Sequence, residues 1–345
     1  DIDAEANGQS EFSAVRFSDT ASVIQPLTNN VAVAKTAVDN TRPPNAPTMR
    51  LHCAVRRFLR RNASSRHASR RSPGRPPVDR SAARRKPFAP FIIIWKRALS
   101  GKQKPDPRLN PWRDDLAAAH LRGEVDAPKF VEGTLKQMTA PVAALRRSPA
   151  DGAMQDSQLL YGELFTIYEE KNGWAWGQAA GDDYVGYVPA EAFDAPQPVS
   201  HKLAALRSFV YRTADIKSRP LMALSFGAAL PVLAMENGFA ELATGGFIYA
   251  PHIAALDTYE ADAVSVAQRF IGAPYLWGGR EAAGLDCSAL VQLALMACGQ
   301  ACPRDSDMQE AVLGQAVSTP DYGDIVFWKG HVGFIAGDNL LLHAN

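Results

Sequence analysis

The spacing of apolar residues changes along the chain and divides it into parts. Residues 131–257 alternate short runs rich in Val, Ile, Phe, Tyr and Trp with Asn-Gly and Gly-Asp turn signals, a pattern typical of small antiparallel barrels. Apolar residues at helical spacing predict one helix over 261–270 and a second over 285–299. Three strands are expected after them, over 324–327, 331–335 and 340–343. The predicted fold class is therefore α+β, with small β-barrels followed by a domain of helices and strands.

An internal repeat lies within the barrel region. Asn172-Gly173 and Asn237-Gly238 are 65 residues apart, and the residues around them match at the same offset. Asn-Gly pairs supply the positive φ angles that tight hairpins need. The repeat predicts two copies of one small fold, residues 131–195 and 201–257, joined by an extended linker over 194–200 that contains two prolines.

The first part of the chain has no helical or strand period that persists. Arg, Ser, Pro and Ala dominate residues 56–90, and such a composition buries too little apolar surface to offset its ordering entropy. We therefore expect residues 1–105 to be a disordered basic segment, which need not be native to the protein. In residues 106–130, Asn110-Pro111-Trp112 followed by RDDLAAAHLRGEV predicts a short helix, and we expect this segment, the strap, to lie on the domain that follows.

Charge is distributed unevenly. The whole chain has 37 Lys and Arg against 36 Asp and Glu, a net charge of +1. Residues 51–104 hold 16 of the basic residues and one acid, Asp79, a net +15, so the rest of the chain carries −14. A basic stretch of this kind is either a solvated tail or an arm for nucleic acid or an anionic surface. Because no aromatic platform accompanies the charge, we favour the tail and expect no obligatory nucleic-acid partner.

The sequence indicates no membrane-spanning helix. No run of about 18 apolar residues occurs, and the burst Phe91–Trp95 is far too short. The acidic start of the chain lacks the features of a secretory signal, although a leader before Asp1 is compatible with the absence of an initial Met. These observations leave a cytoplasmic and a cell-envelope location equally open.

Candidate chemistry is found in the last part of the chain. Cys287 begins the second predicted helix, and the partial positive charge of a helix N-terminus lowers the pKa of a thiol there. Taken alone, a Cys is more often a buried structural residue. His331 and His343 fall at strand ends downstream of it. Cysteine peptidase chemistry needs this set: a thiolate, an imidazole that holds it and protonates the leaving amine, and a third group that orients the imidazole.

The other cysteines indicate no metal or disulfide framework. Cys53, Cys298 and Cys302 lack the spacing of a zinc site and the density of a disulfide scaffold, so we interpret them as structural or incidental thiols. No cofactor is expected, and the low cysteine count slightly favours a reducing compartment.

Five segments over residues 262–345 carry a resemblance to a known family. They are, in order, GAPYLWGGR, GLDCSALVQLALMACG, PRDSDMQ, YGDIVFWKGHVGF and LLHAN. Together they resemble the NlpC-type (NlpC/P60) papain-like cysteine peptidases, which cleave cell-wall peptides. EKNGWAWGQ and DDYVGYVP in the first barrel resemble a bacterial SH3-type domain, and the second barrel does so more loosely. The resemblance implies a papain-like α+β catalytic domain over residues 260–345.

The resemblance also implies roles for individual residues. Cys287 is then the nucleophile, His331 the base and His343 the residue that orients His331, with Tyr275 beside the nucleophile. Residues expected to bind substrate are Asp286, Ser288 and Asp305 for the free amine and the D-glutamyl group, Trp277 as a pocket wall, and Tyr187 as a wall supplied by the first barrel.

The tandem SH3-type units are similar to those of the family members that cut γ-D-glutamyl bonds in short murein peptides. The implied function is a cysteine peptidase that hydrolyses γ-D-glutamyl-diamino acid bonds in peptidoglycan peptides with a free N-terminal L-Ala. A non-catalytic cell-wall peptide-binding protein and nucleic-acid binding through the basic segment are the alternatives.

Two departures from the family pattern stand out. Ala289 replaces a usual glycine, and the chain stops at Asn345 where family members continue with more sheet, so we expect a domain truncated at its C-terminus.

Overall fold

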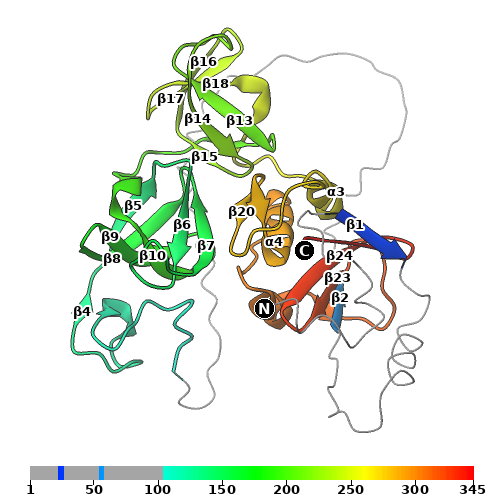
Figure 1. Ribbon diagram of the computed structural model, residues 1–345, viewed down its shortest axis with the longest axis horizontal. Helices are drawn as coiled ribbons and strands as arrows, with labels where there is room; N and C mark the ends of the chain where they lie inside the picture. The colour runs from blue at the N-terminus through cyan, green and yellow to red at the C-terminus, as the bar shows by residue number, and fades with distance from the viewer. Residues whose placement is uncertain (1–21, 27–53, 58–103) are drawn as a thin grey trace, which may run out of the picture. The chain divides into compact units, whose positions relative to one another are not determined.

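The computed structural model describes residues 22–26, 54–57 and 104–345 (Figure 1). The expected disordered segment and the alternative nucleic-acid arm, both within residues 1–105, thus lie almost wholly outside the described residues. What is described there is two strands that the sequence does not predict, β1 (Ser22–Pro26) and β2 (Ala54–Arg57). Within the described residues, no helix is long and apolar enough to cross a membrane.

The strap does not form the helix predicted for it. Its regular structure is a parallel pair, β3 (Ala117–Ala118) and β4 (Phe130–Val131), with one 3-10 turn, η2 (Ala119–Leu121), after β3. Both residues of β3 are fully buried, and their N–H groups donate to the carbonyls of Lys129 and Pro111. Burial in extended form thus outweighs the helix propensity of this alanine-rich run.

The first SH3-type unit is one open antiparallel sheet in the order β11-β5-β8-β9-β10-β6-β7. Its strands are β5 (Thr134–Met138), β6 (Val142–Arg146), β7 (Gln155–Leu160), β8 (Leu164–Lys171), β9 (Trp174–Ala179), β10 (Val185–Pro189) and β11 (Phe193–Asp194). Alternate residues of these strands point inward, and Met138, Leu145, Phe165 and Val188 form the centre of the core.

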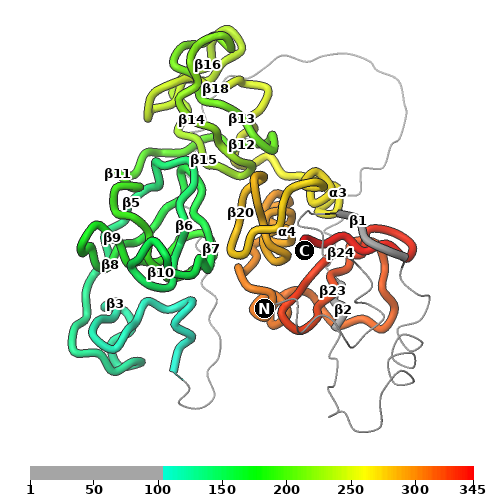
Figure 2. Tube along the Cα trace, in the orientation of Figure 1, coloured from blue at the N-terminus to red at the C-terminus, as the bar shows by residue number. Residues whose placement is uncertain are grey.

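The second SH3-type unit consists of two sheets, in the orders β15-β12-β19 and β14-β13-β18-β17-β16. The strands are β12 (His201–Leu203), β13 (Arg207–Tyr211), β14 (Pro220–Ser225), β15 (Ala229–Leu230), β16 (Val232–Glu236), β17 (Phe239–Leu242), β18 (Phe247–Tyr249) and β19 (Ile253–Ala255). Figure 2 follows the trace from the strap through both units into the C-terminal domain (residues 260–345).

The repeat found in the sequence has a structural basis in its turns. Asn172 and Asn237 have φ angles of 51° and 52°, and the glycines after them have 80° and 79°, as the Asn-Gly pattern predicts. Gly162 also has a positive φ, and a Cβ there would collide with the carbonyl oxygen of Ala229 in the second unit. Because the N–H of Ala229 donates to the carbonyl of Tyr161 at 2.9 Å, the backbones of the two units meet directly at this glycine.

The C-terminal domain combines helices with a sheet to which β1 and β2, from earlier in the chain, also contribute. The predicted α+β class is confirmed. Its elements are α3 (Ala263–Gln268), β20 (Arg280–Glu281), β21 (Gly284–Leu285), α4 (Cys287–Ala297), α5 (Ser306–Val312), β22 (Gln315–Ala316), β23 (Ile325–Trp328), β24 (His331–Gly337) and β25 (Leu340–His343). The two predicted helices and three predicted strands are present, whereas α5 was not predicted.

The sheet of this domain has the order β1-β25-β24-β23-β2-β22. The three strands β23, β24 and β25 form an antiparallel meander. The edge of β25 pairs antiparallel with β1, with Ser22 opposite His343. Helix α4 packs on β24, which brings the start of the helix to the start of that strand.

A buried arginine fixes the C-terminal domain to the first SH3-type unit. Arg280 is 2% exposed, and its guanidinium pairs with Glu163 at 3.0 Å and donates to the carbonyl of Gln158 at 2.7 Å. Its Nε donates to Gln292 of α4 at 2.9 Å. These contacts place β7 of the unit directly against the helix that begins at Cys287.

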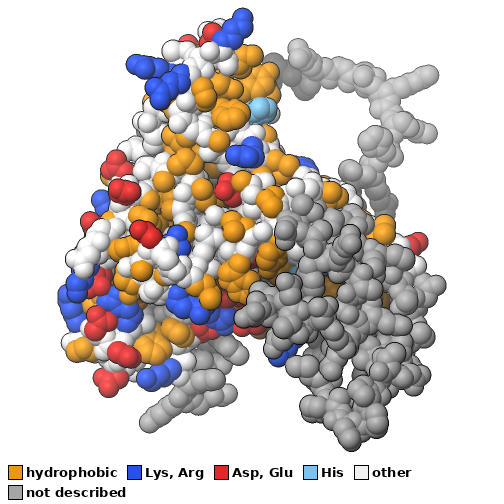
Figure 3. All heavy atoms as spheres, in the orientation of Figure 1, with side chains coloured by type: hydrophobic (Ala, Val, Ile, Leu, Met, Phe, Trp, Pro, Cys, Tyr) orange, Lys and Arg blue, Asp and Glu red, His pale blue; other side chains and the backbone are white. Residues whose placement is uncertain are grey.

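The described surface carries charges of both signs. On the face seen in Figure 3, Lys and Arg side chains are interspersed with Asp and Glu on the side where the strap and the first SH3-type unit lie. Ion pairs of the strap and the first SH3-type unit include Arg113–Glu169 and Arg147–Asp156, both at 2.7 Å.

Candidate active site

Cys287 is the first residue of α4 and lies buried at the point where the helix meets the sheet. Asp286 precedes it as the N-cap, and its Oδ1 accepts a hydrogen bond from the N–H of Ala289 at 2.8 Å. Backbone N–H groups of Ser288 and Val332 are directed at the Cys287 sulfur. Because Val332 follows His331 in β24, the thiol lies beside the strand end that carries this histidine.

The two predicted histidines are brought together. His331 begins β24, His343 ends β25, and Nε2 of His331 lies 2.8 Å from Nδ1 of His343 in a hydrogen bond. Gly333 allows this approach, because a Cβ there would lie 2.9 Å from the Cβ of His343. With Nε2 engaged, Nδ1 of His331 is the nitrogen left to exchange a proton with the thiol.

Trp328 covers this pair. It stands opposite His331 across the β23–β24 hairpin, and its ring centroid lies 5.4 Å from that of His331 and 6.2 Å from that of His343. An indole in this place limits the access of water to the imidazoles. Trp328 belongs to the motif YGDIVFWKGHVGF, but its place at the site is not predictable from the sequence, since a tryptophan beside a tight turn is equally typical of a surface hairpin.

The protonation states differ from the sequence-based expectation. Burial, with a smaller contribution from Asp286, raises the pKa of the Cys287 thiol to about 12, so burial outweighs the lowering expected from the helix N-terminus. Burial also lowers the pKa of His331 and of His343 to about 4. Near neutral pH the site therefore rests as a neutral thiol beside a neutral imidazole, and the proton moves from sulfur to nitrogen as attack begins.

This resting state predicts the pH dependence of alkylation. Because iodoacetamide reacts with the thiolate, we expect its rate at Cys287 to rise about tenfold per unit between about pH 6 and pH 10. Mass spectrometry of the digested protein measures this rate, and Cys298, whose pKa is raised to about 11, is the reference in the same digest. A rate at Cys287 that is constant below about pH 8 would instead indicate a stable thiolate–imidazolium pair.

Tyr275 lies close enough to Cys287 for the two groups to interact electrostatically, and its role at the site stays a prediction. The side chain is half-buried, and its backbone forms a bridge with Leu285 just before α4. Burial raises the pKa of the phenol, and electrostatic interactions with Cys287 and Asp286 raise it further. The phenol therefore keeps its proton and is available as a hydrogen-bond donor.

The contacts of Trp277 do not assign it a role in substrate binding. Its side chain is 60% exposed, and its carbonyl accepts a hydrogen bond from Gln155 of β7 at 2.9 Å. Its role as a pocket wall stays a prediction.

Asp286 is already saturated with hydrogen bonds. Arg304 donates to Oδ1 at 2.9 Å and to Oδ2 at 2.7 Å, and the N–H of Gly278 also donates to Oδ2 at 2.9 Å. Ser288, the next expected binding residue, donates its hydroxyl to Oδ1 of Asp286 and accepts from Arg304. Asp286 and Ser288 therefore anchor the start of α4 in this structure.

Arg304 is a site residue that the sequence analysis missed. It is 1% exposed and holds both oxygens of Asp286, while its Nε donates to Ser157 of the first SH3-type unit at 3.0 Å. The signal was present in the segment PRDSDMQ, where an arginine stands among acidic residues, but nothing in the sequence reveals its burial.

Two tyrosines of the first SH3-type unit differ in what they contact. Tyr184, just before β10, donates its hydroxyl to Oδ2 of Asp305 at 3.1 Å. Tyr187 accepts a hydrogen bond from Arg113 of the strap at 2.9 Å and so points to the strap instead. Both tyrosines belong to DDYVGYVP, and their three-residue spacing does not tell from sequence alone which one faces the C-terminal domain.

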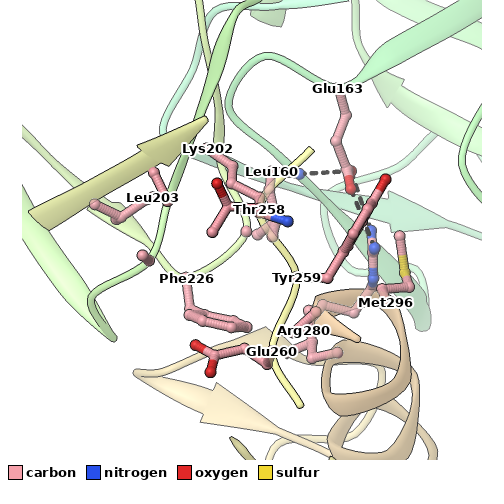
Figure 4. Close-up of a pocket in the computed structure, with 15 residues that line it drawn as sticks. Leu160, Glu163, Lys202, Leu203, Phe226, Thr258, Tyr259, Glu260, Arg280 and Met296 are labelled. Carbon is pink, nitrogen blue, oxygen red and sulfur yellow. Dashed lines mark hydrogen bonds and ion pairs between the residues drawn. The ribbon is translucent and has the colours of Figure 1, made fainter. Parts of the chain in front are cut away.

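A cavity of about 230 Å³ lies at the junction of both SH3-type units and the C-terminal domain (Figure 4). Leu160 and Glu163 of the first unit, Lys202 of the second, and Leu293 and Met296 of α4 are among its walls. None of the predicted catalytic residues lines it, and it adjoins the end of α4 remote from Cys287. Within the described residues, no group of three His, Cys, Asp or Glu side chains could hold a metal ion.

A buried cysteine at a helix start, beside a hydrogen-bonded histidine pair on adjacent strands, is the arrangement that cysteine-peptidase chemistry needs. Comparison with known proteins identifies two of the domains. Residues 272–345 match the NlpC/P60 family, and residues 145–193 match the bacterial dipeptidyl-peptidase SH3 domain. The chain is therefore a cysteine-type peptidase with an NlpC/P60 domain and a bacterial SH3 domain.

Two bacterial relatives are similar to more than half of the chain. The γ-D-glutamyl-L-lysine dipeptidyl-peptidase of Bacillus subtilis is 28% identical over 221 residues, which are 54% of this chain and 71% of that protein. Dipeptidyl-peptidase 6 of Lysinibacillus sphaericus is 27% identical over 233 residues, 60% of this chain and 86% of that protein. A crystal structure of an NlpC/P60 protein from Bacillus cereus has the same fold, with a TM-score of 0.53 at 19% identity, over 61% of this chain and 90% of that one.

Proposed function

We propose that this protein hydrolyses the bond between γ-D-glutamate and a diamino acid in peptidoglycan peptides that have a free N-terminal L-Ala. The observation that carries the proposal is the placement of Cys287 at the start of α4 beside a histidine pair joined at 2.8 Å. The names of the relatives, a γ-D-glutamyl-L-lysine dipeptidyl-peptidase among them, support the choice of substrate.

The proposed reaction proceeds through an acyl-enzyme. The sulfur of Cys287 attacks the γ-carbonyl carbon of the D-glutamyl residue while its proton passes to Nδ1 of His331. His343 keeps the ring of His331 in place through the bond at Nε2. The oxyanion is stabilised by the N–H of Cys287, with the phenol of Tyr275 as the second donor.

Collapse of the tetrahedral intermediate breaks the carbon–nitrogen bond, and the departing amine takes its proton from His331. Water then attacks the thioester, giving its proton to the now neutral His331. Release of the γ-D-glutamyl product regenerates the thiol. Every proton in this cycle moves between sulfur, imidazole, amine and water.

Asp305 is the proposed acceptor for the ammonium group of the substrate. Its side chain is 25% exposed, whereas both oxygens of Asp286 are bound to Arg304. A carboxylate that retains accessible acceptor capacity pairs well with a primary ammonium group. Tyr184 of the first SH3-type unit lies against this carboxylate, which favours a substrate whose chain begins there.

Product analysis tests the proposed function. The full chain is incubated with a tripeptide L-Ala-γ-D-Glu-diamino acid and with the matching tetrapeptide, each with a free and with an acetylated amine, and the products are identified by mass spectrometry. We expect release of L-Ala-γ-D-Glu from the free-amine peptides and little cleavage of the acetylated ones. Cleavage at another bond, or equal cleavage of both forms, would contradict the proposal; saturable binding without cleavage would favour a non-catalytic wall-binding protein.

A further inference from the structure

Arg108 of the strap contacts Asp305, the carboxylate that we propose binds the ammonium group of the substrate. Resting on the proposed function, we infer that Arg108 is a positioning residue for amine recognition: it fixes one oxygen of Asp305 and leaves the other directed to the substrate. Nothing in the sequence motifs of the C-terminal domain points to Arg108, because it lies 197 positions earlier in the chain.

Several bonds hold the guanidinium of Arg108 in place. Nη1 donates to Oδ2 of Asp305 at 2.8 Å, and Nη2 donates to Asp307 at 2.9 Å and to Asp106 at 2.8 Å. The backbone is held as well, since the carbonyl of Arg108 accepts from the N–H of Val185 at 2.8 Å. Arg108 thus joins three parts of the molecule, the strap, the first SH3-type unit and the start of α5, at one point.

The two oxygens of Asp305 are used unequally. Oδ2 accepts from Arg108 and from the hydroxyl of Tyr184, at 2.8 and 3.1 Å. Among the described residues no hydrogen bond to Oδ1 is formed, and although Asp305 is the N-cap of α5, its side chain does not cap the helix. A carboxylate with one oxygen anchored and one oxygen available presents a fixed acceptor to an ammonium group.

The charge around Arg108 also suits a cation. Asp106, Asp305 and Asp307 all bind this one guanidinium, so the cluster keeps an excess of negative charge. Arg147 and Asp156, which lie close by, pair with each other at 2.7 Å, so their charges cancel. Arg108 therefore orients Asp305 without removing the attraction for an incoming ammonium group.

Arg108 also favours the ionised form of Asp305. Burial raises the pKa of this carboxyl, while Arg304, Arg108 and the hydroxyl of Tyr184 lower it. Loss of Arg108 removes one of the cations that oppose burial, so the pKa of Asp305 rises and the carboxyl is protonated at a higher pH. The acid limb of kcat/KM for free-amine substrates must then move to higher pH.

The test compares Arg108→Gln with Arg108→Lys and with a matched control, Arg113→Gln. Arg113 is also a strap arginine held by carboxylates, Asp115 and Glu169, but its contacts do not include Asp305. For the free-amine tripeptide we expect Arg108→Gln to raise KM roughly tenfold with kcat changed less than about twofold, and to shift the acid limb upward. Arg108→Lys should restore part of both effects, and Arg113→Gln should leave the acid limb in place.

Binding of the dipeptide L-Ala-γ-D-Glu, measured by calorimetry on the wild-type chain and on Arg108→Gln, separates the two proposals. If the wild type cleaves the tripeptide but Arg108→Gln behaves like Arg113→Gln, the inference fails and the proposed function stands. If the wild type binds the dipeptide in an Arg108-dependent way without cleaving the tripeptide, the proposed function fails and the inference stands. Absence of both binding and cleavage overturns both.

Discussion

Replacing Cys287 by Ala is expected to abolish peptide hydrolysis, with kcat lower by at least about a thousandfold. The substitution removes the only sulfur placed at the start of α4, and a methyl group cannot form the thioester on which both halves of the reaction depend. The matched control is Cys298→Ala at the other end of the same helix, half-buried and remote from His331.

The measurement is initial-rate hydrolysis of the free-amine tripeptide by full-length protein, followed by chromatography of the products. Cys298→Ala should retain the wild-type rate within about twofold, since it changes no group in the proposed reaction. Turnover by Cys287→Ala at the wild-type rate would show that another nucleophile acts, and the cysteine mechanism would have to be abandoned.

The second large effect concerns stability, and it is expected for Arg304→Met. Arg304 is 1% exposed and its Nη2 lies 2.7 Å from Oδ2 of Asp286. Methionine fills much of the same volume but leaves the Asp286 carboxylate buried without its cation, a change that lowers the free energy of unfolding by about 3–5 kcal/mol. Because Asp286 caps α4, the start of the helix and the position of Cys287 should loosen as well, and activity should fall with stability.

Urea unfolding followed by tryptophan fluorescence measures this effect. Arg147→Met is the matched control, since Arg147 also binds an aspartate at 2.7 Å but is 66% exposed. Its loss should change the free energy of unfolding by less than about 1 kcal/mol. Arg304→Lys should recover only part of the loss, because one ammonium group does not reproduce the two parallel bonds of a guanidinium. Equal unfolding curves for Arg304→Met and Arg147→Met would contradict the assigned role.

The sequence predicted those elements whose pattern is local. Helices α3 and α4 have apolar faces at helical spacing and clear end signals, and Gly299 after α4 has the positive φ of 77° expected of a helix terminator. The Asn-Gly hairpins were predictable for the same reason. The strap was predicted wrongly, because its alanine-rich run favours a helix locally while the observed strand depends on carbonyls of Lys129 and Pro111.

The proximity of His331 and His343 and the position of Cys287 at a helix start could be predicted, since a motif carries each of these residues; their catalytic roles stay a proposal. The contacts between distant segments could not be predicted. Tyr184, and not Tyr187, donates to Asp305, and Arg304 binds the carboxylate of Asp286. Both contacts depend on how the first SH3-type unit packs on the C-terminal domain, which no local pattern in the sequence shows. The pKa of Cys287 was mispredicted for a related reason: a helix N-terminus is visible in a sequence, whereas the burial that outweighs it is a property of the packed molecule.

The environment of Arg280 bears on how the parts of this chain can be recombined. Its guanidinium is satisfied by Glu163 and Gln158 of the first SH3-type unit together with Gln292 of α4. An NlpC/P60 domain without that unit would keep the guanidinium of Arg280 but lose its partners Glu163 and Gln158. The side of α4 that packs against β7 would also be uncovered. The first SH3-type unit is therefore part of the fold of the C-terminal domain. A chimera that takes this domain from one protein and its SH3-type unit from another must transfer β7 and Glu163 together with α4.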